Sequence, residues 1–150
     1  MAAPTYTWEF VYDLWGDRVP RMVTLEATAS LETKVGTLLV MNGGQVDEAT
    51  ANATEIIGLA AEATSAAATA ADPIKVYVIA PGMVIRGTAD ADATALAGLA
   101  HKSVDVNTNG SLDVDDTAGG CLAVLRCNNS AGTEVDCVVT QGAMLLDTTS

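Results

Sequence analysis

Aromatic residues are crowded at one end of this chain. Five of the six lie within the first fifteen positions, and Tyr77 is the sixth: Tyr6, Trp8, Phe10, Tyr12 and Trp15. The rest of the 150-residue chain must build its core largely from small and aliphatic side chains, since it is rich in alanine (26), threonine (18) and glycine (13). A chain of this length can form one domain with a sizeable core. Small side chains make that core thin and suggest that neighbouring subunits contribute to stability.

The spacing of these rings predicts an extended strand with one aromatic face, because four of them occupy alternate positions. Gly16, Asp17 and Pro20 then interrupt the pattern, so residues 1–21 are interpreted as an extended N-terminal arm and residues 22–150 as a single β-rich domain. Each buried ring contributes at most roughly 4–6 kcal/mol, while ordering costs roughly 1–2 kcal/mol per residue. The arm therefore needs a surface to lie on, either the chain's own sheet or another subunit.

Short strands separated by turns are predicted after the arm. Together they predict a mainly β fold: a compact, barrel-like or β-tulip-like domain of short antiparallel strands and hairpins. The expected elements are strands over Met22–Thr28, Val35–Asn42 and Thr54–Ala60, a turn at Asn42–Gly44, an irregular alanine-rich loop over 61–71, a hairpin of Ile74–Ala80 and Met83–Thr88 around Pro81 and Gly82, and a short helix or loop over 91–102.

The three cysteines fit the core of a hairpin in the last third of the chain. Cys121–Cys127 and Thr133–Val139 can pair antiparallel, with partner numbers that sum to 260. All three thiols then lie on one apolar face, where free cysteine acts as a small hydrophobic residue. Arg126 is expected to pair with Glu134 across the strands. We therefore predict structural cysteines, without a metal and without a disulfide framework.

One segment has two interpretations. Asp105–Asp116 matches a calcium-binding loop at most ligand positions but has Asp116 where a glutamate is expected, and it lacks the following helix. The alternative is a β-hairpin that pairs Val106 with Leu112 and Val104 with Val114, with Gly110 in the left-handed position of its turn. That register sets Asp105 opposite Asp113, which is unfavourable unless solvent or a cation screens the pair.

Charge and motif content exclude several classes of function. Seven basic residues against 19 acidic residues give a net charge of −12, so neither nucleic acid nor an anionic membrane is expected as a partner. His101 is the only histidine, and the sequence contains no nucleophile elbow, P-loop or zinc motif. We expect no enzyme activity and no cofactor. Because no cationic, leucine-rich leader opens the chain, we expect synthesis in the cytoplasm.

Three segments resemble head decoration (capsid cement) proteins of tailed bacteriophages, of the lambda-like kind in the broad sense. They are Lys34–Val46, Ile56–Ala60 and Ile74–Arg86, and the similarity covers roughly residues 22–90. The resemblance implies a β-rich protomer that trimerises on the capsid exterior. It also implies an N-terminal segment that contacts the major capsid protein, and no catalytic residues.

The expected function is therefore a structural virion protein that binds the capsid exterior and bridges major capsid protein subunits. Its expected partners are the major capsid protein and itself, as a homotrimer. The net negative charge would keep free copies apart and away from packaged DNA. The alternatives are another phage structural subunit, such as a minor coat or tail protein, and a calcium-dependent extracellular adhesion module. The residues predicted to attach to the capsid or a subunit are Tyr6, Trp8, Phe10, Tyr12 and Trp15.

Overall fold

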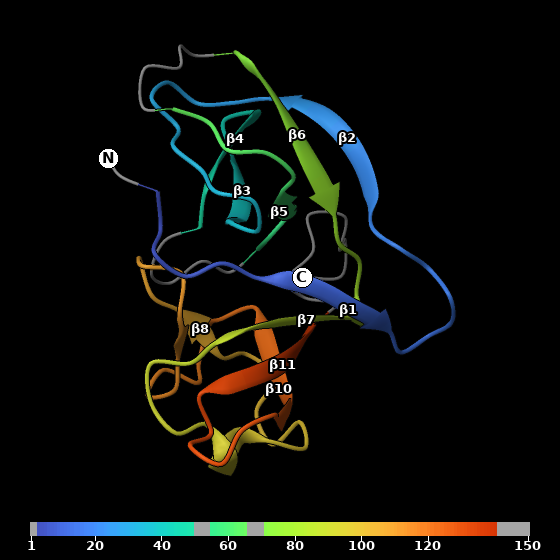
Figure 1. Ribbon diagram of the computed structural model, residues 1–150, viewed down its shortest axis with the longest axis vertical. Coiled ribbons are helices and arrows are strands. Elements are labelled where there is room, and N and C mark those ends of the chain that lie inside the picture. The colour runs from blue at the N-terminus through green and yellow to red at the C-terminus, as the bar shows by residue number, and fades with distance from the viewer. Residues whose placement is uncertain (1–2, 50–54, 66–70, 141–150) are drawn as a thin grey trace.

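The computed structural model describes residues 3–49, 55–65 and 71–140. It confirms a mainly β fold, built from three antiparallel sheets (Figure 1). The first sheet has the order β1 (Glu9–Asp13), β7 (Met83–Thr88), β11 (Glu134–Val139) and β10 (Leu122–Cys127). The second has the order β2 (Arg21–Glu26), β6 (Pro73–Val78), β5 (Gly58–Ala60), β3 (Leu38–Asn42) and β4 (Gln45–Glu48). The third pairs β8 (Asp105–Val106) with β9 (Leu112–Asp113).

Two hydrophobic cores lie in the two halves of the molecule. The second sheet packs around the smaller core. Its strand β6, for example, alternates buried Ile74 and Val76, which belong to this core, with exposed Lys75 and Tyr77. The edge strands of this sheet come together where a parallel bridge joins Ala27 to Val46. The larger core lies between the first sheet, the β8–β9 pair and the inner face of β3 and β5. Within the described ranges, no helix is both long and apolar enough to cross a lipid bilayer.

Several turn predictions are confirmed. β3 and β4 form a hairpin in which Asn42 pairs with Gln45, and Gly43 and Gly44 both have the positive φ that its two-residue turn requires. The alanine-rich loop is irregular as far as residue 65; most of the remainder lies outside the described residues. Residues 91–102 contain one short 3₁₀ turn, η1 (Thr94–Leu96).

The predicted hairpin of β6 and β7 is wrong. The chain does turn tightly between them, because the Met83 amide donates to the Ala80 carbonyl (3.0 Å) and Gly82 has a φ of +90°. However, β6 pairs with β2 and β5, whereas β7 pairs with β1 and β11. The turn therefore carries the chain from one sheet to the other, since packing and not the turn selects the partners of each strand.

The cysteine hairpin is confirmed, but its register is wrong. Val124 pairs with Cys137, a sum of 261 and not 260, and a bulge before Arg126 moves the next pair to Arg126 and Asp136. The bulge changes which side chains share a face, so Arg126 forms its ion pair with Asp136 (2.9 Å) and not with Glu134. Cys121 and Cys137 are buried in the core, as predicted, while Cys127 is half-buried against it.

The hairpin interpretation of residues 105–113 is confirmed. Asp105 pairs with Asp113 and Val106 with Leu112, in the predicted register. Gly110 has a φ of +91° at the predicted position of the turn. Val104 differs from the prediction, because it forms a bridge with Leu122 of β10 instead of Val114. The hairpin is thereby attached to the first sheet.

The interpretation of residues 1–21 as an arm outside the core is wrong for its central part. β1 pairs with β7 and so completes the chain's own sheet. Trp8 is only 3% exposed and belongs to the larger core, where its indole N–H donates to the Gly110 carbonyl (2.8 Å). Its ring lies directly on Gly87, where any β-carbon would collide with it. Gly87 and Gly110 thus provide the surface on which the N-terminal segment lies, and the sequence did not reveal it.

Replacing Trp8 with alanine should lower the free energy of unfolding by about 3–5 kcal/mol, because a large ring and its buried hydrogen bond are lost together. Urea unfolding monitored by circular dichroism measures this loss. The matched control is Trp15→Ala, whose exposed ring should change stability by no more than about 1 kcal/mol. Equal effects of the two substitutions would contradict the placement of Trp8 in the core.

Candidate functional site

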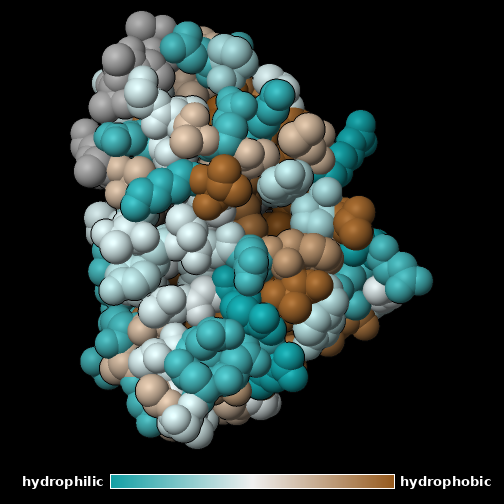
Figure 2. Space-filling view, viewed as in Figure 1, coloured by the Kyte–Doolittle hydropathy of each residue, from teal (hydrophilic) through white to brown (hydrophobic). Residues whose placement is uncertain are grey.

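Exposed apolar side chains gather where the chain passes from β1 to β2. In this β1–β2 loop (residues 14–20), Leu14 is 45% exposed, Trp15 66% and Val19 72%, and Met22 follows at 53%. Tyr77 is the cross-strand partner of Met22 and is also exposed. Figure 2 shows apolar side chains gathered on this side of the molecule, around a hollow. We refer to these five residues together with Tyr12 as the apolar patch.

A buried carboxylate fixes the conformation of the loop. Asp13 has a fully buried side chain that accepts two hydrogen bonds from the Arg18 guanidinium, from Nε (2.6 Å) and Nη2 (2.8 Å). The backbone amides of Trp15 and Arg18 donate to the same carboxylate. Arg18 Nη2 also donates to the Pro81 carbonyl (2.8 Å). The loop is thus closed around Asp13 and attached to the turn between β6 and β7.

The indole of Trp15 is held in place although it is exposed. Its ring lies against Gly82, where an added β-carbon would come within 2.6 Å of the ring. The Arg18 guanidinium lies 5.3 Å from the ring centroid, within the range of a cation–π interaction. The Leu14 amide also donates to the Gly82 carbonyl (2.8 Å). Gly82 therefore positions both the backbone and the ring of this loop.

An apolar groove of about 330 Å³ continues from the loop between the two large sheets. Val19 and Pro20 line one part of it, and Phe10, Val35 and Tyr77 line others. Leu59 and Ala60 of β5 also contribute to the lining. The groove and the apolar patch share Val19 and Tyr77, so the two form one continuous apolar surface.

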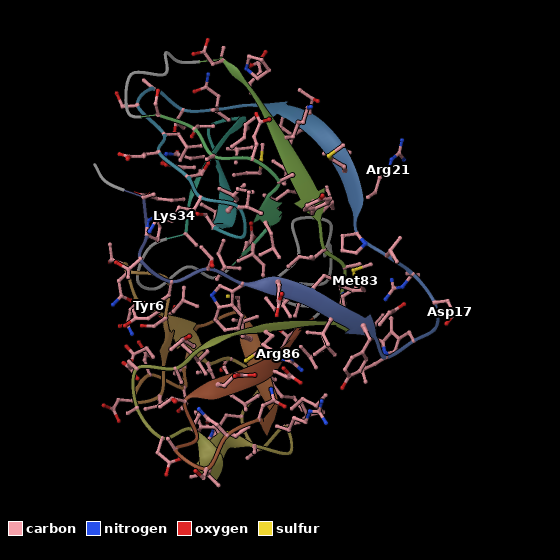
Figure 3. The ribbon with its side chains drawn as sticks, in the orientation of Figure 1. Tyr6, Asp17, Arg21, Lys34, Met83 and Arg86 are labelled. Atoms are coloured by element: carbon pink, nitrogen blue, oxygen red, sulfur yellow. The ribbon has the colours of Figure 1, made fainter. Side chains whose placement is uncertain are left out.

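The loop region carries no net charge, unlike the rest of the molecule. Residues 13–21 contain Asp13 and Asp17 against Arg18 and Arg21, two negative and two positive charges. The whole net charge of −12 therefore lies elsewhere in the chain. Figure 3 shows Asp17 at the tip of the protruding loop and Arg21 pointing outward farther along, at the start of β2.

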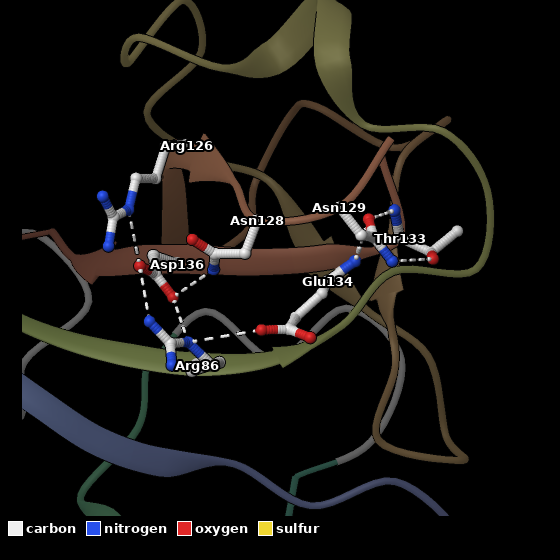
Figure 4. Close-up of polar contacts among 7 residues, drawn as sticks. All are labelled: Arg86, Arg126, Asn128, Asn129, Thr133, Glu134 and Asp136. Carbon is white, nitrogen blue, oxygen red and sulfur yellow. Dashed lines mark hydrogen bonds and ion pairs between the residues drawn. The ribbon is translucent and has the colours of Figure 1, made fainter. Parts of the chain in front are cut away.

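Two other arginines are committed to a different carboxylate. Asp136 is fully buried and accepts hydrogen bonds from Arg86 (2.8 Å), Arg126 (2.9 Å) and Asn128 (2.8 Å) (Figure 4). Burial disfavours its charged form, but these donors outweigh that effect and hold its pKa below the ordinary value. This cluster joins β7, β10 and β11, and we interpret it as structural.

The structure separates the residues that were predicted to attach. Trp8 is in the core, Phe10 is half-buried and lines the groove, and Tyr6 and Tyr12 are partly exposed. Trp15 is the most exposed of the five. Leu14, Val19 and Met22 were not predicted from the sequence, and neither was the anchoring pair of Asp13 and Arg18. The available signal was the presence of large apolar residues on both sides of a polar Gly-Asp-Arg turn.

The residues considered for chemistry do not come together. His101 is exposed, whereas Cys121 and Cys137 are buried in the core, and burial raises the pKa of the Cys121 thiol to about 12. Within the described ranges, no three His, Cys, Asp or Glu side chains are grouped so as to hold a metal ion. No protein-family model matches the chain, and no curated protein sequence matches it.

The link between Asp13 and Arg18 should resist mild acid. The bond from Arg18 holds the pKa of Asp13 at about 2, below its ordinary value of 3.8. Because the folded-state pKa is depressed, the stabilisation is complete above about pH 4 and is lost as the pH falls through about 2. Nuclear magnetic resonance of the Arg18 Nε–H should show this midpoint. A midpoint near 4 would contradict the ion pair.

Calcium should leave the melting temperature unchanged. The side-chain oxygens that a calcium loop would use are engaged within the turn, since Asn109 Oδ1 accepts from the Ser111 amide (3.1 Å) and hydroxyl (2.7 Å). Asp113 Oδ1 likewise accepts from the Asp115 amide (3.1 Å). Calorimetric titration with Ca²⁺, and with Mg²⁺ as the control, tests this. Heat of binding with a raised melting temperature for Ca²⁺ alone would restore the calcium hypothesis.

Proposed function

We propose that this chain is a structural virion protein that binds the outer surface of a phage capsid and stabilises it by bridging major capsid protein subunits. The observation that carries this proposal is the continuous apolar surface formed by the apolar patch and the groove. A large apolar area left in water is typical of a protein-interaction site. Here the loop part of that area is also rigid and free of net charge.

Other features are consistent with a binding role. The cysteine thiols at positions 121 and 137 are buried and stay protonated at neutral pH, because desolvation raises the pKa of both. The strong negative charge outside the loop region disfavours contact with packaged DNA and supports a place on the exterior of the shell. The resemblance of Lys34–Val46 and Ile56–Ala60 to decoration proteins points the same way. We propose self-association into a homotrimer as part of this role.

Binding to capsids that lack the protein tests the proposal directly. Purified protein should sediment with expanded, undecorated capsids and saturate at a fixed ratio to the coat subunits. Electron microscopy should then show it on the outer surface only, and bound capsids should disrupt at a higher temperature than bare ones. Binding to isolated tails but not to capsids would contradict the proposal and favour a tail protein.

A further inference from the structure

We propose that Asn42 is a site of spontaneous deamidation, at which water converts the side-chain amide to a carboxylate without an enzyme. Asparagine followed by glycine occurs twice in the chain, at Asn42–Gly43 and at Asn109–Gly110. Both pairs lie in turns between strands. A difference in their reactivity must therefore come mainly from the fold. The reaction needs only water and base, so it does not depend on the proposed function.

Deamidation begins when the backbone nitrogen after asparagine loses its proton and attacks the side-chain carbonyl carbon. A new C–N bond closes a five-membered succinimide ring, and the side-chain nitrogen takes up a proton and leaves as ammonia. Water then breaks one of the two C–N bonds of the ring. Breaking the new bond gives aspartate, and breaking the backbone bond gives isoaspartate. Glycine favours the first step, because it has no β-carbon to obstruct its nitrogen.

The tip of the β3–β4 hairpin leaves the reacting groups at positions 42 and 43 accessible. Asn42 and Gly43 are both exposed, and the Gly43 amide donates to no acceptor among the described residues. A β-carbon added at Gly43 would meet no atom within 4 Å. β3 pairs with β5 at Leu38 and Leu39, whereas Asn42 pairs across the turn with Gln45. A hairpin end of this kind opens at little cost in free energy, so the nitrogen can reach the side chain.

The turn of the β8–β9 hairpin holds the same groups in hydrogen bonds. Asn109 Oδ1 accepts from the Ser111 amide (3.1 Å) and hydroxyl (2.7 Å). The Gly110 amide, which would be the nucleophile, donates to the Asn107 carbonyl (2.9 Å). Gly110 is also buried, and its carbonyl accepts from the Trp8 indole (2.8 Å). Reaction at Asn109 therefore requires opening of a turn that is attached to the larger core, which is costly.

Conversion of Asn42 changes both the charge and the backbone of the hairpin. Asn42 Nδ2 donates to Asp47 Oδ2 (3.3 Å), and a carboxylate at position 42 cannot donate to it. The two carboxylates would instead repel each other on neighbouring strands. Isoaspartate also lengthens the backbone by one carbon, which disturbs the pairing of position 42 with Gln45. Modified chains should therefore bind more strongly to an anion exchanger and have a weakened β3–β4 hairpin.

Ageing of the purified full chain at body temperature and mildly alkaline pH tests the proposal. Peptide mapping by mass spectrometry measures the gain in mass when the amide becomes a carboxylate. In the folded chain, Asn42 should convert at least about tenfold faster than Asn109, because only Asn109 requires a costly opening. In guanidinium chloride the two sites should react at similar rates, since both have glycine next to asparagine. The unfolded chain is thus the internal control for the effect of the fold.

Two glutamine variants identify the source of the acidic species. Asn42→Gln keeps a side-chain amide at the exposed position but would have to close a six-membered ring, which forms much more slowly. The acidic species should therefore be largely absent when aged Asn42→Gln is separated by anion exchange. The matched control is Asn109→Gln, which makes the same change in the other pair and should still give the acidic species. Circular dichroism checks that both variants are folded before ageing.

The outcomes decide the proposal one way or the other. Faster conversion at Asn42 in the folded chain, with similar rates after unfolding, supports it. Equal rates at the two sites in the folded chain overturn it, as does faster conversion at Asn109. An acidic species that forms as fast in Asn42→Gln as in the wild type would come from another residue and would also overturn it. Capsid binding by freshly purified protein tests the proposed function separately, so the two failures are distinguishable.

Discussion

The burial of Trp8 is the interaction on which the arrangement of this molecule depends. Its ring rests on Gly87 of the first sheet, and its indole N–H binds Gly110 in the turn of the β8–β9 hairpin. Its backbone amide donates to Gly36 (2.8 Å), whose own amide donates to Ala60 of the second sheet (2.8 Å). One residue thereby links all three sheets, in a chain whose other core residues are mostly aliphatic or small.

This burial also decides which part of the N-terminal segment is left for a partner. Pairing of β1 with β7 uses the segment up to Asp13 within the chain's own sheet. The chain must then cross to the second sheet, and the crossing brings the large apolar side chains of the β1–β2 loop to the surface. Asp13 and Gly82 hold that loop rigid, so the exposed surface has a defined shape. The same strand that completes the fold thus presents the candidate attachment surface at its end.

Local patterns were sufficient where the structure depends on local geometry. The turn glycines Gly43, Gly44 and Gly110 predicted two hairpins, and the pairing of Asp105 with Asp113 followed from the length of its turn. Local sequence patterns failed where a strand or a side chain can pair with more than one partner in the fold. The turn at Pro81 and Gly82 has the composition of a hairpin turn, yet its two strands belong to different sheets. Likewise, the cysteine hairpin departs from the predicted register even before the bulge at Arg126, and its Asp136 is shared between Arg126 and Arg86 on a third strand.

The sequence alone determined that this protein is β-rich, strongly acidic and poor in groups for chemistry, and that its aromatic residues need a surface. Composition and alternation are sufficient for these properties, since they reflect the burial preferences of individual side chains. Only the tertiary structure decided which rings are inside. That choice depends on two glycines that are far from Trp8 in sequence: Gly87 leaves room for its ring, and the Gly110 carbonyl accepts the hydrogen bond from its indole N–H. Position along the chain gives no information about such long-range fit.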